Sequence, residues 1–210
     1  MTCVMALRWI SLFSRVACAL LAAAGALVVI AARAQDPVDR IPPDGQPWRI
    51  ERAADIPPQL RAALKRADCL QSEAMLATFP IELFRPAAGS SPMAIVPCVG
   101  LILYGRAFLF DRDARGEPRP LAFPVMALPG RASQSETPGF LTWNQSTRTL
   151  VALHGNDVCD GTMTRHTYRH DPRRDGDDLN GFALAKVERG KLGCGAGENW
   201  QVVWEADARR

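Results

Sequence analysis

The spacing of apolar residues changes once along the chain, from a helical period to a strand-like one. Between residues 55 and 69, Leu60, Ala63 and Leu64 recur at helical spacing behind two prolines that suit a first turn, and Asp55 is the expected N-cap. Apolar or β-prone runs then recur about every ten positions, with turn residues between them. These runs are residues 79–84, 93–98, 101–104, 107–110, 121–128, 139–143, 149–153, 163–168, 181–187 and 200–204.

Three connections between these runs have the composition of hairpin turns, namely residues 111–116, 144–147 and 171–181. Two further stretches, residues 86–92 and 129–138, are expected to be longer loops. In the last run, Trp200 and Trp204 alternate with other side chains and are predicted to share a core face. The pattern therefore predicts a mainly β (α+β) fold, with antiparallel β-meander sheets and one short N-terminal helix.

The beginning of the chain follows a different pattern. Arg8 and Arg15 precede an apolar run from residue 16 to residue 32, and Ala32-Arg33-Ala34 supplies a small-x-small cleavage site. This order is typical of a secretory signal peptide, so residues 1–34 are predicted to be removed on export. The alternative is an uncleaved membrane anchor, because the run approaches the roughly 20 residues of a spanning helix. The expected location is the periplasm of a Gram-negative-type cell, with membrane contact only if the segment is retained.

Processing at this site changes the charge and the size of the protein. The three arginines of residues 1–34 account for the whole net charge of +3, so the mature chain of 176 residues is neutral. A neutral chain gives no electrostatic reason to expect nucleic acid as a partner. Residues 35–47 are rich in Pro, Asp and Gly and are predicted to form a disordered linker, and residues 48–210 a single domain.

Four cysteines remain after processing: Cys69, Cys98, Cys159 and Cys194. An even number in an oxidising compartment predicts two disulfides, and three connectivities are possible. We favour Cys69–Cys98 and Cys159–Cys194, because each pair lies within one half of the chain. No two of these cysteines are close enough in sequence for finger-like zinc spacing, so no metal site is predicted.

Several motifs of the chain resemble those of a known family. They are the segments 57–64, 95–98, 107–110, 121–124, 147–150, 157–161, 181–184, 194–195 and 200–204. In this order they resemble the proteobacterial family called domain of unknown function 1176, over about residues 55–206. Residues 162–170 depart from the family, because they are polar and basic where it is rich in glycine. The resemblance implies a periplasmic location, fits the favoured cysteine pairing, and implies no known activity.

Chemistry-bearing side chains gather between residues 154 and 180. His166 and His170 lie on an expected strand, where four residues span about 13 Å, too far for both to bind one metal ion. Residues 171–182 resemble a calcium-binding loop but place Arg173 and Phe182 where oxygen ligands are needed. No serine stands in a nucleophile motif. We therefore predict no catalytic residue, cofactor or metal.

The expected strand at residues 162–170 has polar side chains on both faces, with Arg165 and Arg169 opposite Tyr168. This pattern favours an edge strand or the wall of a recognition surface. Arg165, Tyr168, Arg169 and His154 are the predicted binding residues, for an envelope component of anionic or carbohydrate character or for a protein partner. The expected function is a non-catalytic binding or envelope-associated role. The alternatives are a periplasmic hydrolase with a His/Asp site within residues 154–170 and a secreted inhibitor of a wall-degrading enzyme.

Overall fold

The structure is a computed structural model that describes residues 38, 41, 46–69, 71–99, 103–111, 116–128, 131–155, 162–191 and 199–206. The predicted signal peptide, most of the 35–47 linker and the Cys159–Cys194 pair lie outside these residues. The described residues belong to one compact unit, Pro37–Arg210. None of the helices in this part of the chain is long and apolar enough to cross a membrane.

Two α-helices, and not the single one expected, follow a short 3-10 turn η2 (Ala53–Asp55). They are α2 (Pro58–Arg66) and α3 (Glu73–Thr78). The prediction that Asp55 caps α2 is wrong, because Asp55 ends η2 and the N-cap of α2 is Pro57, which makes no side-chain bond. The N-cap of α3 is Ser72, whose hydroxyl accepts a hydrogen bond from the Met75 amide.

Five strands form an antiparallel meander that we call the N-terminal sheet. In chain order and in spatial order they are β1 (Trp48–Ile50), β2 (Ile81–Phe84), β3 (Met93–Val99), β4 (Leu103–Leu109) and β5 (Arg119–Pro120). One face of this sheet packs on the helices through a cluster that includes Leu60, Leu64, Leu83 and Phe108. The described residues 103–104 of the expected run 101–104 and residues 107–109 of the expected run 107–110 belong to one strand, β4.

The C-terminal sheet is a second antiparallel meander. It consists of β8 (Phe140–Asn144), β9 (Thr149–His154), β10 (Thr162–His170), β11 (Phe182–Lys191) and β12 (Asn199–Glu205). The expected hairpins at 144–147 and 171–181 are confirmed, and the second contains a 3-10 turn, η3 (Pro172–Arg174). A separate ribbon joins β6 (Phe123–Leu128) to β7 (Arg131–Ser135), and β7 lies where a loop was expected.

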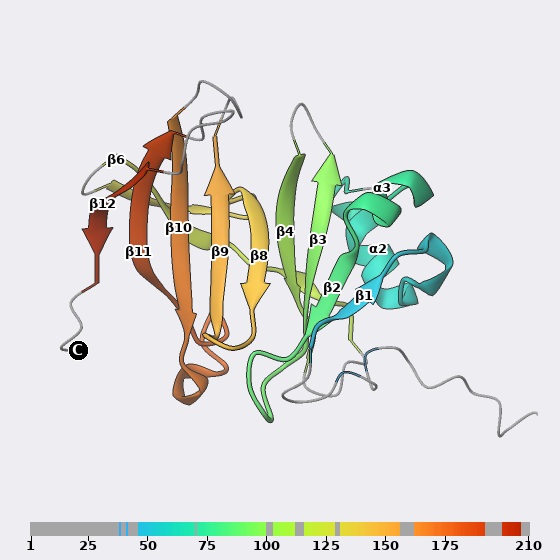
Figure 1. Ribbon diagram of the computed structural model, residues 1–210. Coiled ribbons are helices and arrows are strands. Elements are labelled where there is room, and N and C mark those ends of the chain that lie inside the picture. The colour runs from blue at the N-terminus through green and yellow to red at the C-terminus, as the bar shows by residue number, and fades with distance from the viewer. Residues whose placement is uncertain are drawn as a thin grey trace, which may run out of the picture. The chain divides into compact units, whose positions relative to one another are not determined.

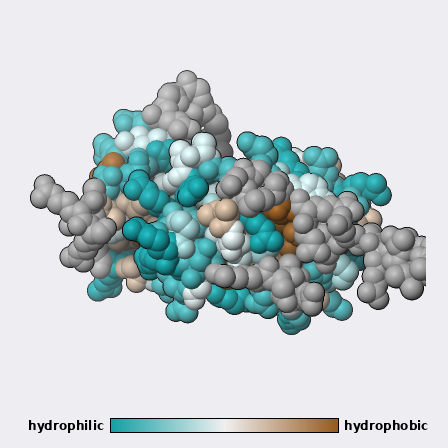
Figure 2. Space-filling model, turned by 90° about the horizontal axis from the view of Figure 1, so that it is seen from below, coloured by the Kyte–Doolittle hydropathy of each residue, from teal (hydrophilic) through white to brown (hydrophobic). Residues whose placement is uncertain are grey.

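The two sheets share a second apolar cluster, so the fold has three layers: helices, N-terminal sheet and C-terminal sheet (Figure 1). Phe84 of β2 stacks on Trp143 of β8 with ring centroids 4.7 Å apart. The Gly105 amide of β4 donates to the Gly139 carbonyl next to β8 over 2.8 Å, which brings the two sheets close together at this point. A side chain at Gly105 would lie 2.9 Å from the Leu141 nitrogen, so this approach requires glycine. The described residues of the face in Figure 2 are mainly hydrophilic, consistent with apolar side chains kept between the layers.

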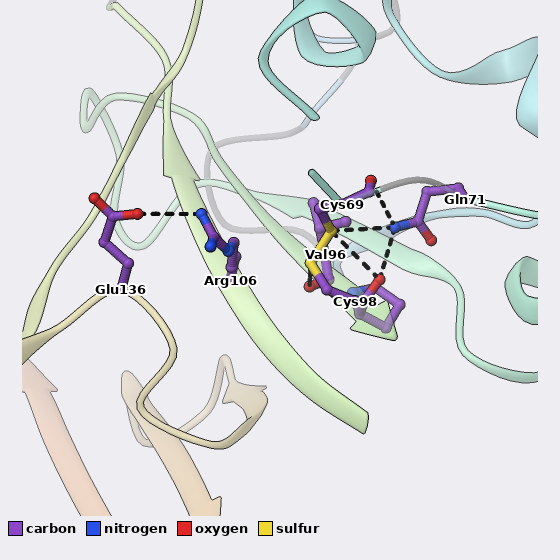
Figure 3. Close-up of a disulfide and its surroundings, with 7 residues drawn as sticks. Cys69, Gln71, Val96, Cys98, Arg106 and Glu136 are labelled. Carbon is purple, nitrogen blue, oxygen red and sulfur yellow. Dashed lines mark hydrogen bonds and ion pairs between the residues drawn. A yellow bond between two sulfur atoms is a disulfide. The ribbon is translucent and has the colours of Figure 1, made fainter. Parts of the chain in front are cut away.

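The predicted disulfide between Cys69 and Cys98 is present and ties the segment after α2 to β3 (Figure 3). Both cysteines are buried in the helix-side cluster. The Gln71 amide nitrogen donates to the Pro97 carbonyl over 2.7 Å beside them. The staple therefore holds the helical layer against the sheet.

Two expectations about the C-terminal sheet are wrong. Strand β10 is not an edge strand, because it lies in the centre of the sheet between β9 and β11. Trp200 and Trp204 do not share a core face, because a bulge next to Val203 pairs Trp200 with Gly190 and Trp204 with Val187. Gly190 and Val187 lie on opposite faces of β11, and both tryptophans are only half-buried.

Candidate functional site

The histidines of β10 face the interior and hold other segments in place. His166 is buried, and its Nε2 accepts a hydrogen bond from the Met126 amide of β6 over 2.9 Å. Burial lowers the pKa of His166 below its ordinary value. A neutral ring with an unprotonated Nε2 is the form that can accept this bond, so His166 anchors the β6–β7 ribbon to the C-terminal sheet.

His170 belongs to a buried three-residue group that we call the clasp, with Asp175 and Ser90. The Ser90 hydroxyl donates to one Asp175 carboxylate oxygen over 2.6 Å, and His170 Nε2 lies 3.0 Å from the other. Burial lowers the pKa of His170, and Asp175 opposes that shift. Asp175 stands between the other two, so His170 is not placed to take the Ser90 proton as a catalytic base would. The clasp instead joins the β2–β3 loop to the β10–β11 loop.

The four predicted binding residues do not form one surface. Tyr168 is 0% exposed, and its hydroxyl donates to the Pro124 carbonyl over 3.0 Å. Burial raises its pKa. Arg165 and Arg169 lie on the opposite face of β10, since side chains alternate along a strand. His154 pairs in register with Thr164, which places it on the Tyr168 side of the sheet.

Arg165 does lie on the outer face of the C-terminal sheet, in a cluster whose side chains contact one another. Its Nε donates to the Glu188 carboxylate over 2.8 Å, and the Lys186 ammonium lies 2.9 Å from the other Glu188 oxygen. The Arg165 guanidinium also stacks 4.2 Å from the centre of the Trp200 ring. Burial would raise the pKa of Glu188, but the hydrogen bonds from Arg165 and Lys186 outweigh it and the pKa is lowered. These four side chains are already engaged with one another.

A cavity of about 270 Å³ lies where the two sheets meet, and we call it the junction slot. It takes residues from β1 to β4, from the end of α3 and from β8. The lining residues are Arg49, Thr78, Phe79, Pro80, Glu82, Ile95, Pro97, Gly105, Phe140, Leu141 and Thr142. Ligand sites in proteins are typically concave, mostly apolar and furnished with a few convergent polar groups. The junction slot has this composition.

One ion pair provides the charged groups of the junction slot. Arg49 and Glu82 face each other across β1 and β2, and the Arg49 Nη2 lies 3.2 Å from a Glu82 oxygen. The Glu82 side chain is 19% exposed and that of Arg49 64% exposed. Glu82 pairs in register with Ile95 of the shared core, so both groups lie on the face turned toward the C-terminal sheet.

Two aromatic rings form apolar walls of the slot. Phe79, next to α3, and Phe140, on β8, pack edge to face with centroids 6.0 Å apart. Phe79 is one of the exposed large hydrophobic residues of the described chain, at 36%. The slot therefore offers an aromatic pair and an ion pair, drawn from β1, from the segment that runs into β2, and from β8.

Three other cavities are less suited to a small ligand. The cavity beside η2 and α2, of about 1000 Å³, is bordered by Arg61, whose guanidinium already donates to the carbonyls of Ala53 and Ile56. Ion-paired side chains line the remaining two: Arg174 and Asp177 in one, and Arg106 and Glu136 in the other. No histidine lines any of these four cavities. Among the residues that the structure describes, no group of three His, Cys, Asp or Glu side chains could hold a metal ion.

Sequence reasoning missed the junction slot, although one signal for it was present. Glu82 stands inside the apolar run 79–84, between the core residues Ile81 and Leu83. A carboxylate there must either reach solvent or find a partner. Nothing in the sequence names Arg49 as that partner or brings Phe140 across from the other sheet.

Comparison with protein-family models, with curated proteins and with solved structures finds no match for this chain. The resemblance to domain of unknown function 1176 therefore remains a prediction from the sequence motifs.

Proposed function

We propose that this protein is an exported, non-catalytic binding domain that takes a small ligand into the junction slot. The signal-peptide pattern of residues 1–34 supports export, and the Cys69–Cys98 disulfide fits an oxidising compartment. Binding rests on the slot itself. No family or homologue contributes to the proposal.

The observation that carries the proposal is the presence of an ion pair in the lining of a mostly apolar cavity where the two sheets meet. The sheets are fixed by the shared core and by the Gly105–Gly139 hydrogen bond, so the walls are preformed. A preformed cavity loses little conformational entropy when a ligand enters. The aromatic walls supply contact area, and the ion pair supplies orientation.

The geometry favours binding over the hydrolase alternative. Hydrolysis requires a nucleophile, a base and an acceptor for negative charge around one open site. His166 and His170 are instead buried and bonded to Met126 and Asp175. The outer-face cluster around Arg165 is a weaker candidate than the slot, because Glu188 and Trp200 already engage its guanidinium.

A ligand-observed NMR screen of small polar and apolar fragments tests the binding proposal. Thr142 lines the slot and is exposed, so Thr142→Trp is designed to fill it from the rim. Arg169→Ala, on the outer face of β10, is the matched control. We expect wild-type hits to be lost in Thr142→Trp and kept in Arg169→Ala. Hits that survive Thr142→Trp, or an absence of hits with folded wild type, would overturn the proposal.

Export is tested separately, by the intact mass of protein released from the periplasm. We expect a chain that starts at Gln35 and lacks the hydrogens of two disulfides. A chain that keeps residues 1–34, or that carries four free thiols, would contradict export with cleavage.

A further inference from the structure

We propose that the ligand of the junction slot is a free α-amino acid with an apolar side chain. The inference rests on the proposed binding function and adds the chemical class of the ligand. The slot presents one cation, one anion and an apolar wall within a single small cavity, which matches the three parts of such an amino acid.

The ion pair that lines the slot is available to a ligand. Arg49 is 64% exposed and Glu82 is its only ion-pair partner among the described residues, which makes this a surface-type ion pair of low intrinsic strength. A zwitterion can replace the single contact by two: its ammonium group donates to Glu82, and its carboxylate accepts from the Arg49 guanidinium. Arg49 can turn outward to make room, because its side chain is mostly in solvent. No charge is left unpaired in the complex.

The walls suit an apolar side chain next to this charged end. Phe79 and Phe140 stand edge to face at one side, while Ile95 and Pro97 continue the apolar lining from β3. The cavity of about 270 Å³ lies just below the roughly 300–1,000 Å³ of typical ligand sites, which favours a small ligand. An amino acid with an apolar side chain is a ligand of this kind.

The charge of the site also argues against simpler ligands. Arg49 and Glu82 are the charged residues among those that line the slot, so the site is neutral as a whole. A simple carboxylic acid would engage Arg49 and leave Glu82 without its partner, and a simple amine would do the reverse. Leaving one charge unpaired in a partly desolvated site costs affinity.

The test is isothermal titration calorimetry of the protein with L-leucine and with three probes that each lack one part of leucine. The three probes are 4-methylpentanoate without the ammonium group, 3-methylbutylamine without the carboxylate, and glycine without the side chain. We expect leucine to bind, and each of the other three to bind at least about tenfold more weakly, since each lacks one charge-assisted bond or the apolar contact.

Variants assign the binding to the slot. We expect Glu82→Gln and Arg49→Gln each to weaken the binding of leucine by about tenfold or more. Arg131→Gln, on the exposed β7 strand, is the control and should leave the affinity for leucine unchanged. Equal binding of leucine and 3-methylbutylamine, or of leucine and 4-methylpentanoate, would overturn the inference. If other fragments bind in the slot and leucine does not, the inference is overturned but the proposed binding function stands. No binding of any fragment would remove both.

Discussion

At the scale of single residues, buried hydrogen bonds join segments that the chain keeps far apart. Ser90 and Asp175 are 85 positions apart, yet their bond of 2.6 Å connects the loops of two different sheets. The Arg85 guanidinium donates to the Ser90 carbonyl over 2.7 Å and holds the same loop from the other side. Ser90 is buried and its two partners are partly buried, so the loss of either bond would leave a polar group poorly satisfied.

Ser90→Ala tests the strength of the clasp. The substitution removes a donor to the Asp175 carboxylate, and we expect the free energy of unfolding to fall by about 1.5–3 kcal/mol. Urea denaturation followed by tryptophan fluorescence measures this. Ser133→Ala, on the exposed β7 strand, is the control and should leave the midpoint unchanged. A clasp variant with the wild-type midpoint would show that the bond does not contribute.

The two buried histidines predict a pH dependence of stability. Burial lowers the folded-state pKa of both His166 and His170 below the ordinary value near 6.5. The folded protein therefore binds fewer protons than the unfolded chain as the pH drops through and below about 6.5, and stability falls there. The slope is at most about 1.4 kcal/mol per pH unit for each histidine.

Unfolding free energies between pH 7.5 and pH 5 measure this slope. His166→Gln keeps an acceptor for the Met126 amide and removes the titrating group, so we expect a shallower slope with stability near neutral pH largely retained. An unchanged slope in His166→Gln would contradict the assignment of one buried neutral histidine to that position.

At the scale of elements, the β10–β11 hairpin depends on a glycine at its end. Gly181 has φ +82°, and a Cβ there would lie 2.5 Å from the Asp171 carbonyl oxygen and 3.1 Å from His170 Nε2. Gly176 in the same loop has φ +98° but no atom within 4 Å of its would-be Cβ. The two positions separate backbone strain from steric clash.

We expect Gly176→Ala to cost about 1–2 kcal/mol from backbone strain alone. Gly181→Ala should cost about 1–3 kcal/mol more, because the added methyl group presses on the clasp. Thermal or urea unfolding of the pair measures the difference. Equal destabilisation would show that the loop relaxes around the methyl group and that the clasp geometry is not tight.

The disulfide links the helical layer to β3, and its removal is a second prediction at this scale. Cys69 and Cys98 are 29 positions apart, and closing a ring of that length stabilises a fold by about 3–4 kcal/mol in the chain-entropy model. The double variant Cys69→Ala with Cys98→Ala should lose that amount in urea. Wild-type stability in the double variant would mean that the staple is formed but not needed.

Hydrophobic spacing predicted most of these elements because most strands keep one face in a core, whereas the exposed strand β7 has no such pattern. The hairpin at 144–147 followed from turn residues alone, and the pairing of Cys69 with Cys98 from their position in one half of the chain. Strand β10 was misplaced for a physical reason. His166 and Tyr168 are polar, so they were expected to face solvent, but Met126 and Pro124 satisfy them in the interior. Sequence periodicity does not show such distant partners.

At the scale of the whole molecule, the junction slot depends on how the two meanders pack together. Gly105 and Gly139 bring β4 and the start of β8 together, and Gly105 lines the slot. The charged residues of the slot belong to one sheet, and Phe140, Leu141 and Thr142 to the other. No local pattern could predict a site that depends on how the two sheets are packed.

The most direct test of binding in the junction slot is a map of backbone amide chemical shifts of the mature domain on addition of a fragment that binds. We expect the shifted amides to centre on Glu82, Gly105 and Thr142, on both sides of the slot. Shifts centred on Arg165 and Arg169 would instead place the ligand on the outer face of the C-terminal sheet and contradict the proposed site.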